Sequence, residues 1–124
     1  MIRRRRIPLL RSVAVAALAA LACVAVACAA PAPPRHYEFV IPEGTAGLIA
    51  TNRAPEIFPP NLVVHVGDSL TIINDDKFVQ EVGPYRLKPK SRISQHFSSP
   101  EVLEGTCAMS MGGSLTVTVL PKKT

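Results

Sequence analysis

The sequence predicts an all-β domain, a Greek-key β-sandwich, preceded by an N-terminal signal or anchor helix. From residue 37 onward, short β-branched segments are bounded by Pro, Gly, Asn or Asp. Several of these segments alternate apolar and polar residues, the pattern of a strand with one buried face. No stretch in this region is long enough for an amphipathic helix, and 124 residues leave room for one domain.

Residues 1–30 are expected to export the chain. Five arginines lie in the first eleven positions, and residues 13–30 carry no charge. Residues 31–34, Pro-Ala-Pro-Pro, cannot continue a helix. A basic segment, an apolar segment and small residues at the exit are typical of a secretory signal, with a retained membrane helix as the alternative. Both interpretations place the arginines in the cytoplasm and the domain outside it.

Cys28 is the candidate lipidation site. Val26-Ala27-Cys28 resembles a bacterial lipobox, although Ala25 stands where such boxes usually have Leu. We therefore expect an extracytoplasmic lipoprotein that is anchored to the membrane. Ordinary cleavage near Ala30, which would give a secreted protein, is the alternative.

The charge distribution argues against nucleic-acid binding. The chain carries a formal charge of +5, with 14 basic and nine acidic residues. Because five of the basic residues belong to the export segment, the remaining nine balance the nine acids, and the domain has no excess of basic residues. The expected partner is the membrane, through the anchor or lipid. A protein partner, or a copper donor or acceptor, is a further candidate whose identity the sequence does not give. No nucleophile–base arrangement or phosphate-binding loop indicates an enzyme.

Residues 31–36 are interpreted as a Pro-rich tether and residues 37–124 as the domain. The predicted strands are 37–41, 62–66, 70–74, 79–82, 92–97, 102–107 and 114–120. Gly67-Asp68 separates two apolar runs at a hairpin-like spacing, and Asn74-Asp75-Asp76 is interpreted as a turn that ends a strand. The predicted core consists of Leu62, Val64, Leu70, Ile72, Phe97, Leu115, Val117 and Val119.

Several short motifs occur along the chain in the same order as in one protein family. They are Phe58-Pro59, Leu62, Val64, Gly67-Asp68-Ser69-Leu70, Ile73-Asn74-Asp75-Asp76, Val82-Gly83-Pro84-Tyr85, Phe97, Pro100, Gly105-Thr106-Cys107 and residues 113–117. From about Glu38 to Val119, the chain resembles the cupredoxins, the small β-sandwiches of blue-copper proteins. This resemblance implies a copper site of two His, one Cys and usually a weak axial Met.

The ligand set that the resemblance implies is incomplete in this chain. Gln80 stands at the position of the first His, and Ser110 stands at that of the second. Cys107 is retained, and Met111 lies in the axial neighbourhood. Since an amide and a hydroxyl do not replace imidazole for Cu(II), we expect no type 1 blue-copper site. The leading interpretation is a metal-free binding or structural module at the cell envelope, with electron transfer through copper a distant alternative.

Cys107, Met109 and Met111 support a second interpretation. In an extended segment, residues i, i+2 and i+4 point the same way, so that one thiol and two thioethers would converge. Soft sulfur ligands select Cu(I), and the protein would then bind or transfer that ion. Alternatively, the two methionines fill the end of the core and Cys107 is a buried small apolar residue. The cofactor is therefore either none or copper.

The three histidines are not expected to form a site. His65 and His96 are interpreted as ordinary surface residues. His36 lies in the expected tether, where it could act as a terminal copper ligand, but nothing nearby in the sequence completes a site.

Overall fold

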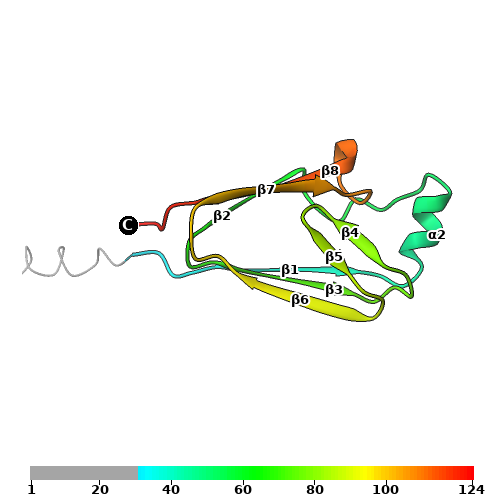
Figure 1. Ribbon diagram of the computed structural model, residues 1–124, viewed down its shortest axis with the longest axis horizontal. Helices are drawn as coiled ribbons and strands as arrows, with labels where there is room; N and C mark the ends of the chain where they lie inside the picture. The colour runs from blue at the N-terminus through cyan, green and yellow to red at the C-terminus, as the bar shows by residue number, and fades with distance from the viewer. Residues whose placement is uncertain (1–30) are drawn as a thin grey trace, which may run out of the picture. The chain divides into compact units, whose positions relative to one another are not determined.

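The computed structural model describes residues 31–124, of which nearly half lie in strands (Figure 1). In chain order the elements are β1 (His36–Ile41), α2 (Thr45–Ala50), β2 (Asn61–His65), β3 (Ser69–Asn74), β4 (Gln80–Val82), β5 (Tyr85–Leu87), β6 (Ser91–His96), β7 (Glu101–Thr106), the 3₁₀ turn η1 (Met111–Gly113) and β8 (Ser114–Leu120). The expected N-terminal helix and the lipidation site Cys28 lie outside the described residues. Within residues 31–124, no helix has the length and apolar character needed to cross a membrane.

The strands form two three-stranded sheets and a hairpin. One sheet has the order β1-β3-β6, the other has the order β2-β8-β7, and β4 pairs with β5 (Figure 1). β1 runs parallel to β3 and β2 runs parallel to β8, whereas the other three pairings are antiparallel. Both sheets therefore join segments that are far apart in the sequence.

One apolar core lies between the two sheets. All eight residues predicted for it are buried, and β8 shows the expected alternation along its length. The buried apolar cluster contains Ile41, Phe58, Leu62, Val64, Leu70, Ile72, Val82, Leu87, Phe97, Cys107, Met109, Leu115, Val117 and Val119. Alternation of apolar residues thus identified the buried face of each sheet correctly.

All seven predicted strands are present, and the structure adds β5. This three-residue strand follows the turn at Gly83 and Pro84, where Gly83 has a φ of +58°. It is too short to show a period of two, so it forms through its pairing with β4 rather than through its own pattern.

The hairpin-like spacing at Gly67-Asp68 was misleading. β2 and β3 belong to different sheets, so this turn carries the chain from one sheet to the other. The Asp68 carboxylate accepts hydrogen bonds from the backbone N–H of His65 at 2.9 Å and of Arg35 at 2.8 Å. The backbone N–H of Gly67 donates to the carbonyl of Phe97 at 2.8 Å. These contacts with distant segments, and not the turn residues alone, determine where the chain goes.

The short helix α2 was not expected. Six residues are too few for a helix that is stable by itself. Here the carboxylate of Asp76, some 30 residues away along the chain, accepts the N–H groups of Gly44 and Ala46 at the start of the helix. The stabilising partner comes from tertiary structure, so the local sequence does not reveal the helix.

Candidate functional site

Gln80, which the sequence resemblance places at the first His position, is buried at the start of β4. Its side-chain Nε2 donates a hydrogen bond to Oδ2 of Asp76 at 2.9 Å. The same carboxylate, which is 2% exposed, accepts backbone N–H groups from Ala46 at 2.7 Å, Lys77 at 2.8 Å and Gly44 at 3.2 Å. Gln80 is thus one of four donors around a single buried carboxylate.

These donors keep Asp76 ionised. Burial raises the pKa of Asp76, but the hydrogen bonds from the backbone of Ala46, Lys77 and Gly44 and from the Gln80 side chain outweigh it. The pKa of Asp76 therefore lies below its ordinary value. An amide suits this position because it presents a donor to the carboxylate without adding a titratable group.

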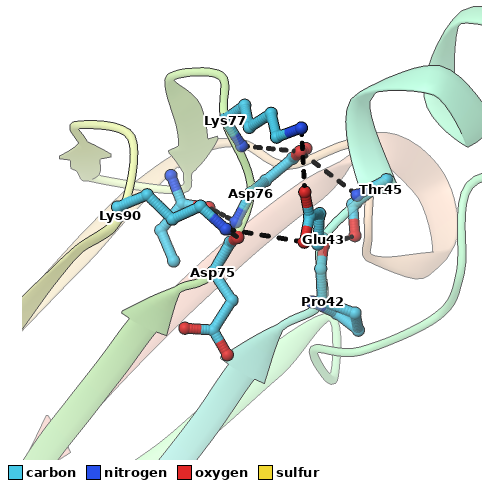
Figure 2. Close-up of polar contacts among 9 residues, drawn as sticks. Pro42, Glu43, Thr45, Asp75, Asp76, Lys77 and Lys90 are labelled. Atoms are coloured by element: carbon cyan, nitrogen blue, oxygen red, sulfur yellow. Dashed lines mark hydrogen bonds and ion pairs between the residues drawn. The ribbon is translucent and has the colours of Figure 1, made fainter.

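Exposed ion pairs surround this buried cluster (Figure 2). Glu43 lies 3.2 Å from Nζ of Lys77 and 3.7 Å from Nζ of Lys90. The Lys90 side chain also donates to the carbonyl of Asp75, and its backbone N–H donates to the carbonyl of Asp76. Such exposed pairs each contribute little to stability. The hydrogen bonds to the buried Asp76 carboxylate are therefore the main link between α2 and the turn before β4.

The loop after β7 does not bring the three predicted sulfur ligands to one face. Residues 107–110 form a turn, in which the N–H of Ser110 donates to the carbonyl of Cys107 at 3.2 Å. The extended conformation that the alternation argument assumed is therefore wrong. Cys107 and Met109 are buried in the core, whereas Met111 is 67% exposed.

Cys107 is a free thiol with no exposed surface. Burial raises the pKa of Cys107, and hydrogen bonding to the backbone of Met109 and Gly83 only partly opposes this effect. The thiol consequently stays protonated near neutral pH. A protonated, buried thiol is neither a strong nucleophile nor a ready metal ligand.

Ser110, which the sequence resemblance places at the second His position, is 7% exposed, and its hydroxyl oxygen has no hydrogen-bond partner among the described residues. It forms a parallel bridge with Phe58, and the N–H groups of Ile57 and Phe58 donate to the carbonyl of Met109. Residues 54–56 and 108–111 line an open hollow of about 150 Å³ beside this bridge. Met109 and Met111 both border this hollow, and Cys107 does not.

The histidines lie at the other end of the sandwich from Cys107. His65 closes β2, where it pairs with Leu120, and its Nδ1 lies 4.0 Å from Oδ2 of Asp68. His96 closes β6 and is exposed. His36 is the first residue of β1 rather than part of a tether. Among residues 31–124, no three His, Cys, Asp or Glu side chains are close enough together to hold a metal ion.

Asp76 is the residue of this site that sequence reasoning did not identify. The Asn74-Asp75-Asp76 motif was interpreted as a turn, and the N–H of Asp76 does donate to the Asn74 side chain at 3.0 Å. Its second role is as acceptor for the Gln80 side chain, four residues away, and for backbone N–H groups at the start of α2, which is distant in the sequence. The one available signal was the spacing of four residues between Asp76 and Gln80.

No family model matches the sequence, and no curated protein matches it. One solved structure is similar to the chain and is described as "Novel Purple Cupredoxin from Nitrosopumilus maritimus". The similarity covers 67% of this chain and 98% of that one, at 22% sequence identity and a TM-score of 0.45.

Proposed function

We propose that this protein is an exported cupredoxin-like domain of Greek-key topology that lacks a type 1 copper centre. It acts as a metal-free binding or structural module at the cell envelope and is held at the membrane by lipid on Cys28. The proposal combines the order of sequence motifs from Phe58 to Val117 with the observed pair of sheets.

The hydrogen bond from Gln80 to Asp76 is the observation that carries the proposal. Type 1 copper needs two imidazoles, and the residue at the first imidazole position is here an amide donor committed to a carboxylate. That carboxylate also holds the start of α2. The side chain that the family uses for metal binding is therefore part of the internal support of this domain.

The opposite side of the expected site supports the same conclusion. Ser110 supplies a hydroxyl in place of the second imidazole, and burial keeps the Cys107 thiol protonated. Neither group compensates for the missing nitrogen ligands. The metal-free interpretation thus rests on three independent positions of the site.

A second candidate function is the binding or transfer of Cu(I). The observation that favours it is the hollow that both Met109 and Met111 border, because thioethers are ligands that Cu(I) prefers. In this candidate Cys107, adjacent in the loop, completes the site after it loses its proton.

Copper titration of the full chain, purified in detergent with Cys107 reduced, separates these functions. The metal-free module predicts no intense thiolate-to-Cu(II) band and no retention of Cu(I) against a competing chelator. Retention of Cu(I) that is lost in Cys107→Ser would favour the second candidate. An intense visible band in the wild type would overturn the absence of a type 1 centre.

Membrane anchoring is tested separately. Replacing Cys28 by Ser should release the protein from the membrane fraction or block its maturation. A Cys28→Ser protein that fractionates and migrates like the wild type would exclude lipidation, leaving cleavage near Ala30 or a retained helix.

A further inference from the structure

Two of the three histidines share one exposed face of the β1-β3-β6 sheet. The strand register aligns His36 of β1 with Ser69 of β3, and Ser69 with His96 of β6. Residues that are directly paired point to the same face of a sheet. Both histidines are exposed, so this row lies on the outer face, away from the core.

His36 is already oriented for coordination. Its Nδ1 lies 2.7 Å from the hydroxyl oxygen of Ser69, which leaves Nε2 free. That Nε2 is 3.9 Å from Oε2 of Glu38, two residues further along the same face of β1. A histidine that ligates a metal commonly has its other ring nitrogen fixed by a hydrogen bond of this kind.

The surroundings favour a cation. The row next to the histidines contains Glu38, Thr71 and Ser94, and the two hydroxyls are 3.1 Å apart. These two rows contain no Lys or Arg; the nearest basic residue in register is Arg92, one row further. A positive ion at this place would therefore meet a carboxylate, two imidazoles and hydroxyl groups.

His96 must move to complete the set. Neighbouring strands lie about 4.8 Å apart, so the Cα atoms of His36 and His96, on either side of Ser69, are about 10 Å apart. An exposed imidazole can close much of this gap by changing its rotamer. Without such a change, no three His, Cys, Asp or Glu side chains among residues 31–124 lie close enough together to hold a metal ion.

We propose that His36, Glu38 and His96 form a surface site for a borderline divalent cation such as Zn²⁺. Two imidazoles and one carboxylate are a ligand set that Zn²⁺ accepts, with water in the fourth position. The site lies at the end of the sandwich opposite Cys107 and does not depend on the proposed function.

Calorimetric titration of the untagged full chain in detergent with Zn²⁺ tests the site. We expect one Zn²⁺ per chain, with affinity reduced at least about tenfold by either His36→Ala or His96→Ala and also reduced by Glu38→Gln. His65→Ala is the matched control, because His65 belongs to the other sheet and lies beside Asp68. This variant should bind Zn²⁺ with the affinity of the wild type. Far-UV circular dichroism checks that each variant remains folded.

The Zn²⁺ titration either supports or excludes the site. A wild type that binds no Zn²⁺, or variants at His36 and His96 that bind it as the wild type does, would overturn the site. Binding lost in Cys107→Ser but kept in His36→Ala would move the metal to the loop after β7 and equally exclude this proposal. With Cu²⁺ as a second probe, electron paramagnetic resonance should show nitrogen ligands, and absorption spectroscopy should show no intense thiolate-to-Cu(II) band. Such a band would contradict the proposed function and leave the Zn²⁺ result unaffected.

Discussion

Gly105 in β7 packs directly against the backbone of Gly83, in the turn between β4 and β5. A Cβ atom at position 105 would stand 2.1 Å from the carbonyl oxygen of Gly83 and 2.4 Å from its carbonyl carbon. The backbone N–H of Gly83 in turn donates to the carbonyl of Thr106 at 2.9 Å. The β4–β5 hairpin is therefore joined to the β2-β8-β7 sheet by a contact that leaves no space for a side chain.

Replacing Gly105 by Ala should destabilise the domain by about 3 kcal/mol, because backbone atoms on both sides would have to separate. Urea unfolding, followed by circular dichroism, measures the free energy of unfolding. Gly47→Ala is the control: Gly47 lies in α2 with nothing within 4 Å of a Cβ, so alanine should be neutral or slightly stabilising. Equal effects of the two changes would contradict the close backbone contact.

Asp76→Asn should lower the free energy of unfolding by about 2 kcal/mol, because four donors would lose a charged acceptor. Its neighbour provides the comparison. The Asp75 side chain is exposed and accepts no hydrogen bond in the structure, so Asp75→Asn should change stability by less than about 0.5 kcal/mol. If the two variants unfold alike, the carboxylate does not hold α2 and Gln80.

Acid should weaken the domain through Asp76 and Asp68. Both carboxyls have pKa values below the ordinary 3.8 in the folded domain, where burial opposes but backbone hydrogen bonds dominate. The unfolded chain then binds protons more readily than the folded domain. The stabilisation that the two ionised carboxylates give the folded domain is therefore present above pH 3.8 and is lost as pH falls through their folded pKa values. Urea unfolding at a series of pH values should show this loss. Asp76→Asn should reduce its steepness, and an unchanged steepness would contradict the lowered pKa of Asp76.

Cys107 should resist thiol reagents while the domain is folded. It is fully buried and burial raises its pKa, so both access and thiolate formation are disfavoured. Alkylation at neutral pH, with the modified peptide identified by mass spectrometry, should be slow in buffer and rapid in denaturant. Rapid alkylation of the native protein would show that the loop after β7 opens readily.

If the resemblance identifies the ligand positions correctly, the double variant Gln80→His, Ser110→His should acquire an intense thiolate-to-Cu(II) band, because it places an imidazole at each of them. Each single variant should lack the band, since one imidazole is insufficient. Absorption spectroscopy after addition of Cu²⁺ makes the comparison. If the folded double variant remains colourless, Gln80 and Ser110 are not the positions that the resemblance implies.

Much of the fold could be predicted because strands and core depend on local alternation. The buried face of a strand can be read from alternating apolar residues only two positions apart, such as Leu62 and Val64 or Leu115 and Val117. The pairing of strands could not be predicted in this way. β1 lies beside β3 and β2 beside β8 in parallel, and each of these pairings joins segments separated by a long stretch of chain.

The sequence by itself determined which chemical groups are present: an amide at position 80, a hydroxyl at 110 and a thiol at 107. Under the ligand positions that the resemblance implies, these identities argue against a blue-copper site. Only the tertiary structure decided where the groups point and what they meet. It turned Met111 outward, placed the Asp76 carboxylate between Gln80 and α2, and brought His36 and His96 to either side of Ser69. The physical reason is that side-chain chemistry is a property of one residue, whereas burial and partners depend on segments that meet only when the chain folds.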